Sequence, residues 1–230
     1  MKISIIIPTL NEAGNIARLV EHLRKHGKED LAEIIVVDGG SSDHTEELAR
    51  RAGAITYLSP RKGRSLQMNF GARHASGDIL YFVHADTLPP ATYVKDIRQA
   101  VQADYPIGCF RFRFDSDRWL LKVNSWFTRL DQLWCRGGDQ TLFITRELFE
   151  ELNGFCPDHI IMEEYDLIAR ARKLYPFRII PKDVLVSARK YDNNSYLRVQ
   201  IANLIAFNMY RLGFSQPGIY NTYRKLLDYH

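Results

Sequence analysis

The sequence predicts an α/β protein with a mostly parallel central sheet, helices on its flanks and a C-terminal helical extension. Two observations support this fold class. Short runs of β-branched residues alternate with segments whose apolar residues recur every three or four positions, the pattern of repeated strand–helix–strand units. The apolar runs also stop abruptly at polar residues, which is typical of strands buried on both faces.

The first strand–helix–strand unit is predicted at the N-terminus. Residues 3–7 form an isoleucine-rich run that ends at Pro8. Residues 16–23 follow with helical spacing, and a second apolar run at 34–37 ends at Asp38. Parallel strands joined by a right-handed crossover open at the same edge of the sheet. We therefore expect the loops at 8–12 and 38–43 to be neighbours.

The same pattern continues through residue 83. Asp43 and Glu46 resemble a capping box, which predicts a helix that runs to about residue 52. The elements that follow are a strand at 55–58, a helix at 65–75 and a strand at 79–83. Ligands of such sheets bind beyond the carboxyl ends of the strands, which is where His84 and Asp86 fall.

The pattern changes from residue 107. Residues 107–114 alternate phenylalanine with arginine and cysteine, which predicts a half-exposed, antiparallel strand. Two later helices carry apolar stripes that we expect to pack as core or covering faces rather than to contact lipid. Their members are Trp119, Val123, Trp126, Phe127, Leu130 and Trp134, and then Leu197, Ile201, Leu204, Ile205, Met209 and Leu212. The expected domains are 1–190 and a packed helical extension at 191–230.

The charge is unevenly distributed. Residues 187–230 hold six Lys and Arg against two Asp, which equals the whole net charge of +4. This excess of positive charge is too small to indicate nucleic-acid binding. It makes the basic C-terminal helix a candidate for weak contact with the inner face of a membrane. No apolar run approaches the ~20 residues of a membrane span, and the N-terminus lacks a secretory core, so we expect a cytoplasmic protein.

The cysteines and histidines do not form a metal motif. Cys109, Cys135 and Cys156 are far apart, and no CxxC or HExxH pattern occurs. We expect three buried, unreactive thiols.

Carboxylates follow three of the predicted strands. Glu12, Asp38 and Asp86 should meet at one edge of the sheet, where they could accept hydrogen bonds from a nucleoside or hold a hard divalent cation. Magnesium needs only one or two protein carboxylates beside substrate phosphates, so Asp86 alone is sufficient. The basic segment 61–64 leads into a helix and offers charge and backbone amides to the same phosphates.

Several of these segments together resemble family 2 glycosyltransferases with the GT-A fold. The resemblance covers about residues 1–190, and the stretch at residues 63–90 looks especially like a bacterial subgroup of small, soluble members. The matching motifs are Pro8-Thr9-Leu10-Asn11-Glu12, residues 37–43, residues 67–78, His84-Ala85-Asp86 and Glu163-Glu164-Tyr165-Asp166.

The resemblance implies a nucleotide-sugar donor, most often a UDP-sugar, and a divalent metal, Mg²⁺ or Mn²⁺, held by Asp86. His84 stands where the family has the first acid of its DxD motif, so we expect it to contact the donor rather than magnesium. The implied donor-binding residues are Pro8, Thr9, Asn11, Glu12, Asp38, Gly39, Ser41, Arg64, Gln67, Asn69 and His84.

The resemblance also implies an inverting transfer of hexosyl type with a carboxylate base. The family has Glu-Asp where this chain has Glu163 and Glu164. We expect Glu164 to be the base, with Glu163 and Asp166 as alternatives, and Arg170 to pair with Asp166. The loop of Gly138, Asp139 and Gln140 is either a plain turn or a loop that contacts acceptor and donor.

Other interpretations remain for single motifs. Asn11 with Glu12, and Asp38, could be helix caps, and Glu163 and Glu164 could be ordinary acids at a helix start. The loop after the first strand lacks the glycines of dinucleotide-dependent oxidoreductases and of sugar-phosphate nucleotidyltransferases. The alternative function is a nucleotide-sugar-binding protein that has lost catalysis. The motifs leave the sugar, the acceptor and the oligomeric state undefined, because loop contacts set specificity.

Overall fold

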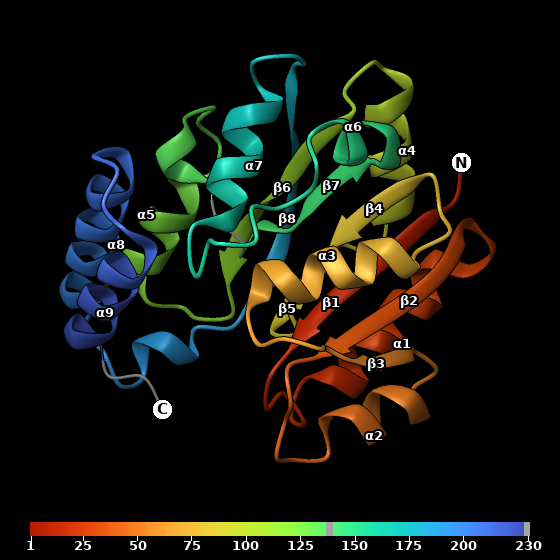
Figure 1. The fold of residues 1–230 in the computed structure, drawn as a ribbon, viewed down its shortest axis with the longest axis horizontal. Coiled ribbons are helices and arrows are strands. Elements are labelled where there is room, and N and C mark those ends of the chain that lie inside the picture. Colours follow the sequence, from red (N-terminus) through yellow and green to blue (C-terminus); the bar gives the residue numbers. More distant parts are fainter. Residues whose placement is uncertain (137–139, 228–230) are drawn as a thin grey trace.

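The computed structural model of the chain describes residues 1–136 and 140–227. Within these residues one sheet of eight strands has the order β3-β2-β1-β4-β7-β6-β8-β5 (Figure 1). The strands are β1 (Ile3–Thr9), β2 (Leu31–Asp38), β3 (Ile55–Leu58), β4 (Ile79–Phe82), β5 (Thr87–Leu88), β6 (Ile107–Phe114), β7 (Leu142–Thr145) and β8 (Phe177–Val186).

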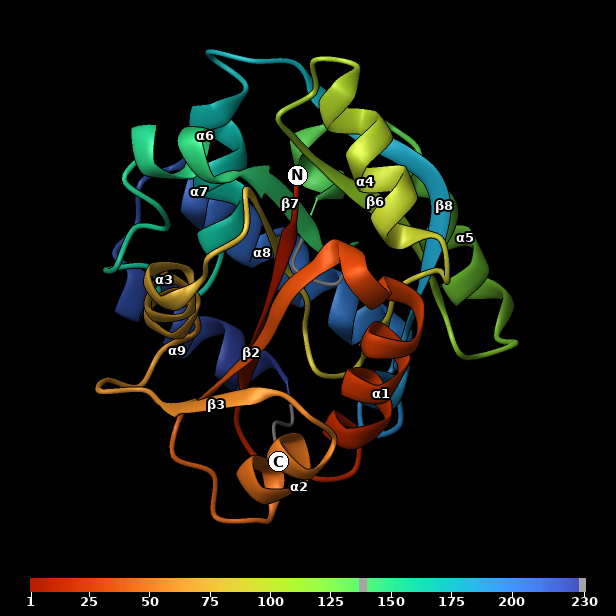
Figure 2. The same ribbon diagram turned by 90° about the vertical axis from the view of Figure 1, so that its right-hand side faces the viewer.

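Helices cover both faces of this sheet. Figure 2 shows α3, α6 and α7 on one side of the strands and α1, α4 and α5 on the other. The helices are α1 (Ile16–Gly27), α2 (Thr45–Arg51), α3 (Arg64–His74), α4 (Tyr93–Gln102), α5 (Trp119–Phe127), α6 (Arg146–Glu151), α7 (Glu163–Ala171), α8 (Tyr196–Arg211) and α9 (Gln216–Leu226). The predicted fold class, a mostly parallel sheet between helices, is confirmed.

The isoleucine run of β1 is buried because both faces of the strand are covered. Ile3, Ile5 and Ile7 belong to the core cluster that includes residues of α1 and α4. Ile6 points the other way, into the cluster formed with α3, α6 and α7. Successive side chains of a strand alternate between faces, so a strand between two helical layers is apolar at nearly every position, and the buried Ser4 hydrogen-bonds to Glu33.

The strands of the first half run parallel, and the direction changes at β7. β1 pairs in parallel with β2 and β4, whereas β7 is antiparallel to both β4 and β6. β6 is antiparallel to β7, as predicted, but parallel to β8 on its other side. The predicted half-exposure of β6 is wrong for residues 107–110, which are buried, with Phe110 in one core cluster and Ile107 and Cys109 in the other.

The helix after the second strand begins later than its predicted capping box. α2 starts at Thr45, and Asp43 accepts hydrogen bonds from the backbone N–H groups of Thr45 and Ala13, both at 3.1 Å. Glu46 pairs instead with Arg50, one turn further on. Asp43 therefore joins the loop after β1 to the start of α2.

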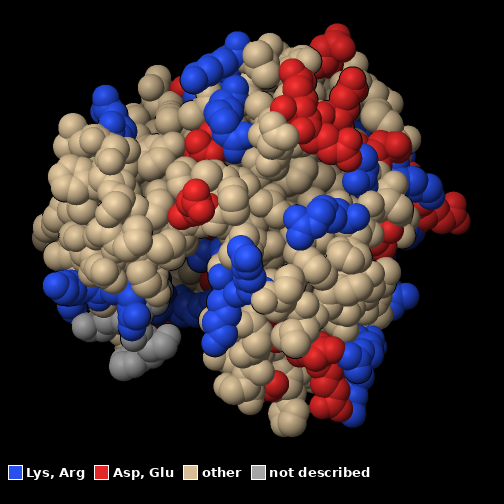
Figure 3. All heavy atoms as spheres, viewed as in Figure 1, with Lys and Arg blue, Asp and Glu red and all other residues tan. Residues whose placement is uncertain are grey.

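The C-terminal part differs most from expectation. α5 ends at Phe127, and its predicted core face is turned outward, with Trp119 70% exposed and Trp126 52% exposed. The same correction applies to α8, whose buried residues are Val199, Ala202 and Ala206 rather than the leucine and isoleucine stripe. Figure 3 shows a broad tan surface on the side of α8 and α9, with Lys and Arg at its lower edge. The small residues allow α8 to lie close against α9.

The cysteines are free throughout the chain, but the expectation that all are buried is wrong. Cys109 is buried, whereas Cys135 and Cys156 are partly exposed. Within residues 1–136 and 140–227 no helix has the length and apolar character needed to cross a membrane.

Candidate active site

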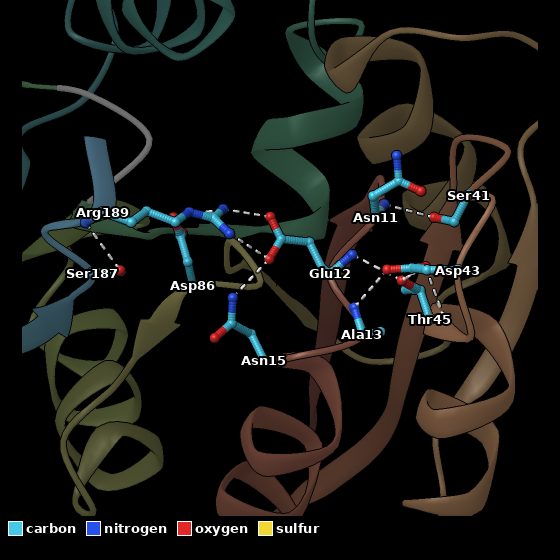
Figure 4. Close-up of polar contacts among 10 residues, drawn as sticks. All are labelled: Asn11, Glu12, Ala13, Asn15, Ser41, Asp43, Thr45, Asp86, Ser187 and Arg189. Carbon is cyan, nitrogen blue, oxygen red and sulfur yellow. Dashed lines mark hydrogen bonds and ion pairs between the residues drawn. The ribbon is translucent and has the colours of Figure 1, made fainter. Parts of the chain in front are cut away.

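The loops after β1 and β2 lie side by side, as the parallel crossover predicts. Asn11 has a left-handed backbone (φ 55°) and accepts a hydrogen bond from the N–H of Ser42 at 2.9 Å. Its own N–H donates to Ser41 Oγ at 2.8 Å. Figure 4 shows Asn11 and Ser41 beside Asp43 and Thr45. The loop at 11–12 is thus fixed by the loop at 41–45, before any ligand is present.

Asp38 ends β2 and organises the loop that follows it. Its Oδ2 accepts hydrogen bonds from the N–H groups of Gly40 and Ser41 at 3.0 and 2.7 Å, and Oδ1 accepts from Thr9 Oγ1 at 3.1 Å. The side chain is buried. Asp38 therefore holds the shape of the rim, and through Ser41 it is linked to Asn11.

Two predicted donor residues on α3 support the site rather than line it. The Gln67 amide donates to the carbonyls of Thr9 and Val37 at 2.9 and 2.8 Å, which joins the ends of β1 and β2. A Cβ atom on Gly39 would lie 3.2 Å from this amide, so the close approach favours glycine. Pro8 lies within β1, opposite Val37.

Asn69 lies two residues further along α3, on another side of the helix, and faces a different loop. Its amide donates to the carbonyl of Phe155 at 2.8 Å and accepts from the N–H of the same residue at 3.0 Å. This pair of bonds fixes the loop after α6 against α3. The structure does not bring Asn69 to the strand ends.

Arg189 connects two of the predicted acidic residues. It lies on the 3-10 helix Arg189–Tyr191 after β8, and its guanidinium donates to Glu12 Oε2 at 3.0 Å and lies 3.1 Å from Asp86 Oδ2 (Figure 4). The hydrogen bond to Glu12, followed by the charge of Asp86, raises the pKa of Arg189 above its ordinary value. Glu12 and Asp86 therefore share one fixed positive charge.

Sequence reasoning missed Arg189. It lies 177 residues from Glu12, and its only signal in the sequence is that it belongs to the basic C-terminal segment.

The start of α7 brings two acids against the end of β4. His84 Nε2 lies 3.2 Å from Glu164 Oε1, and Arg64 Nη1 donates to Glu163 Oε1 at 3.3 Å. Both carboxylates are buried, with the Glu163 side chain fully excluded from solvent. The residue before them, Met162, has a left-handed backbone (φ 65°). His84 thus contacts Glu164, the acid that we predicted as base.

The two acids have opposite pKa shifts. Burial and then the neighbouring charge of Glu164 raise the pKa of Glu163 to about 7. Burial also acts to raise the pKa of Glu164, but the hydrogen bond and the charge of His84 outweigh it and hold that pKa below its ordinary value. Glu163 Oε2 has no hydrogen-bond partner among the described residues, which fits a protonated carboxyl. Glu164 is thus the ionised member of the pair.

Asp166, the third candidate base, is engaged in the predicted ion pair. Arg170 Nη2 lies 2.7 Å from Asp166 Oδ2, and the same arginine donates to the carbonyls of Leu152 and Gly154. Asp166 therefore ties α7 to the loop after α6.

The segment before α7 is held from two sides. The Gln216 side chain accepts hydrogen bonds from the N–H groups of Ile160 and Ile161 at 3.1 and 3.3 Å. Ser65 Oγ donates to the carbonyl of His159 at 3.0 Å. Helix α9 thus helps to place the acids of α7, a role that no local pattern around Gln216 indicates.

The predicted loop of Gly138, Asp139 and Gln140 is only partly described. Gly138 and Asp139 lie outside the described residues. Gln140 is buried, donates to the carbonyl of Cys135 at 3.0 Å and accepts from Cys109 Sγ. The next residue, Thr141, has a left-handed backbone (φ 60°), which is costly for a β-branched side chain.

Comparison with known proteins gives one family model that matches residues 4–165, and its description is glycosyl transferase family 2. A curated relative, the undecaprenyl-phosphate 4-deoxy-4-formamido-L-arabinose transferase of Proteus mirabilis, is 28% identical over 216 residues, which cover 89% of this chain and 65% of the relative. A dolichol-phosphate mannosyltransferase of Pyrococcus furiosus is 31% identical over 115 residues, or 47% of this chain and 33% of the relative. The chain thus spans less than two thirds of either relative.

Solved structures show the same fold. Glucosyl-3-phosphoglycerate synthase of Mycobacterium tuberculosis, crystallised with Mn²⁺, UDP-glucose and phosphoglyceric acid, matches with a TM-score of 0.69 and 19% identity. The match covers 93% of this chain and 80% of that chain. The same synthase has also been crystallised with Mg²⁺ and UDP, and that structure matches with a TM-score of 0.66 at 20% identity.

Proposed function

Because the chain belongs to glycosyl transferase family 2, we propose that it transfers a hexosyl group from a nucleotide-diphosphate sugar, a UDP-sugar, to an acceptor hydroxyl with inversion. The GT-A fold, which was predicted from the motifs, supports a nucleotide-sugar donor. The curated relatives bear the names of sugar transferases, which agrees with the same class of reaction.

The observation that carries this proposal is the contact between the end of β4 and the start of α7. His84 lies 3.2 Å from Glu164, and Asp86 lies two residues after His84. A donor diphosphate at Asp86 would therefore lie near a buried, ionised carboxylate. An inverting transferase needs this combination, with the leaving group and the base on opposite sides of the sugar.

Glu164 is the proposed base. The acceptor oxygen forms a bond to the anomeric carbon while the bond from that carbon to the diphosphate oxygen breaks. The acceptor proton passes to Glu164, and the electron pair of the broken bond leaves with the diphosphate. His84 orients the Glu164 carboxylate through their hydrogen bond. Arg64 forms an ion pair with the second acid, Glu163, and so offsets its negative charge.

The residues at the strand ends fit a hard divalent cation. Asp86 and Glu12 present carboxylate oxygens to one point, where Arg189 now lies. No group of three acidic, histidine or cysteine side chains in the described part of the chain could hold a metal alone. Asp86, with Glu12, would therefore share Mg²⁺ or Mn²⁺ with donor phosphates. A bound cation supplies charge neutralisation of the leaving diphosphate.

The loop around Asp38 is the proposed site for the base and ribose. Asp38 and Thr9 fix its backbone, and the glycines at 39 and 40 keep it open to a close ligand. Arg64 is half-exposed and stands beside Glu163, so it can also reach a donor phosphate.

The test is incubation of the protein with Mg²⁺ or Mn²⁺ and a panel of nucleotide sugars, followed by measurement of released nucleoside diphosphate. We expect release from at least one UDP-sugar, enhanced by an acceptor extract. Tight UDP binding without release from any donor would instead identify a binding protein without catalysis. Asp86→Ala should abolish metal-dependent donor binding, and retained binding would refute the metal assignment.

A further inference from the structure

The helices α5 and α8 expose large apolar side chains on one flank of the molecule. We call this set the apolar flank, and it includes residues of α5, of the 3-10 helix Leu133–Cys135 and of α8 with the turn after it. Its members are Trp119, Val123, Trp126, Phe127, Trp134, Leu197, Ile201, Leu204, Leu212 and Phe214, which are between 37% and 75% exposed.

All three tryptophans of the chain lie on this flank. Trp119, Trp126 and Trp134 are exposed to 70%, 52% and 50%. The rings of Trp126 and Trp134 each contact the ring of Phe127, so part of the flank is an aromatic cluster. Tryptophan is usually well buried in globular proteins, but it is enriched where protein meets the headgroup region of a membrane.

The two helices of the flank are neighbours. Asn124 on α5 and Gln200 on α8 both donate to the hydroxyl of Tyr191, at 3.4 and 3.3 Å. Figure 1 shows α5 and α8 on the same side of the molecule, away from β1, β2 and β3. The exposed side chains of both helices can therefore meet one extended partner.

The charge of α8 and α9, at one side of the flank, favours an anionic partner. α8 and α9 contain Arg198, Arg211, Arg224 and Lys225 and no acidic residue. The space-filling view places Lys and Arg at the lower edge of the tan surface (Figure 3). Two copies joined through this flank would bring like charges together, which is unfavourable. An anionic lipid surface would be complementary to both the apolar centre and the basic edge.

We propose that the apolar flank docks the protein on the surface of a membrane that contains anionic lipid. The helices lie on the surface, with the indole rings at headgroup depth and the basic side chains among the headgroups. The docked helix α8 also packs on the catalytic region, because Phe207 and Tyr210 contact the ring of Tyr165, the residue after Glu164. Docking would therefore place the acid pair close to the membrane surface.

The experiment is sedimentation of the purified full chain with vesicles of phosphatidylcholine, with and without about 30% phosphatidylglycerol. We expect binding to the anionic vesicles that weakens as salt rises. Leu197→Ser with Leu204→Ser, and separately Trp119→Ser with Trp126→Ser, should each lower the partition coefficient tenfold or more. Arg211→Gln and Lys225→Gln should each lower it about fivefold on anionic vesicles only.

The control is Leu174→Ser, because Leu174 is 54% exposed but lies outside the flank, after α7. This variant should bind vesicles as the unaltered protein does. Absence of binding to either vesicle would overturn the proposal. So would a dimer, detected by light scattering, that the Leu197→Ser and Leu204→Ser changes convert to monomer. The readout is lipid binding, so the result does not depend on whether the protein transfers sugar.

Discussion

Two regions of the molecule differ in how their side chains find partners. These are the loops at the ends of β1 and β2 and the flank formed by α5 and α8. In the loops, polar groups such as Asp38 and Asn11 find partners within the chain. On the flank, Trp119 and Leu197 remain about 70% exposed. A region whose polar groups are already satisfied is rigid before it binds its ligand. A region that leaves apolar area in water gains free energy only when a partner covers it.

The largest expected effect concerns the polar region. Glu164→Gln should lower kcat by about a thousandfold, because the amide cannot accept the acceptor proton. UDP affinity should stay the same, and both should be measured with the donor that gives release in the panel. Asp166→Asn is the matched control, since it should reduce stability through the lost Arg170 pair while kcat changes little. If the Glu164→Gln variant kept its activity, the role of catalytic base would have to be assigned to Glu163 or Asp166.

The next effect tests the burial difference directly. Ile5→Ala, at a position with no solvent exposure, should lower the free energy of unfolding by about 3 kcal/mol. Leu197→Ala should change it by less than about 0.5 kcal/mol, because the side chain is already in water in the isolated protein. Urea denaturation measures both. A large loss in Leu197→Ala would show that the flank is covered in solution.

A third effect lies where the two regions meet. Arg189 comes from the C-terminal part and lies between Glu12 and Asp86 of the strand-end loops. Arg189→Ala should strengthen Mn²⁺ binding without nucleotide by about tenfold, because both carboxylates become available to the metal. Calorimetric titration with Mn²⁺ alone gives the affinity. Arg113→Ala removes the same charge from an exposed position on β6, and equal effects in the two variants would refute a specific role.

A fourth effect is on stability as a function of pH. The folded protein holds the pKa of Glu163 at about 7, above the 4.5 of an exposed glutamate. Between pH 4.5 and 7 the folded state therefore binds more protons there than the unfolded state, so this group's stabilising contribution falls as pH rises. Glu163→Gln should remove that loss. Urea midpoints at intervals across this range should fall less with pH in the variant, and parallel curves would contradict the assignment.

The sequence predicted the fold best where the strands are buried on both faces. The apolar runs at 3–7, 34–37 and 79–82 lie in buried strands, and the loops after the first two became neighbours. A strand between two layers has no choice of exposed face, so its pattern and its burial agree. The family 2 motifs at 8–12, 37–43 and 84–86 added the GT-A fold, which the comparisons confirm.

The candidate site was only partly predictable. The motifs named Glu12, Asp86, His84 and Glu164. The structure joins Glu12 to Asp86 through Arg189, and it places His84 in direct contact with Glu164. The motifs could not show that the Asn69 amide hydrogen-bonds to the backbone of Phe155, because an amide binds a backbone as readily as a ligand. Nor could they name Arg189 or Gln216, whose partners lie far away along the chain.

The sequence by itself determined the order of strands and helices, the residues that share each helix face and the loops that carry acids. Only the tertiary structure decided which face of α5 and α8 is buried, and which acid is ionised beside His84. Periodicity records the relation of a residue to its own helix, whereas burial and pKa depend on neighbours brought in from distant parts of the chain. For α8 these neighbours cover Val199 and Ala202 and leave the leucines in water.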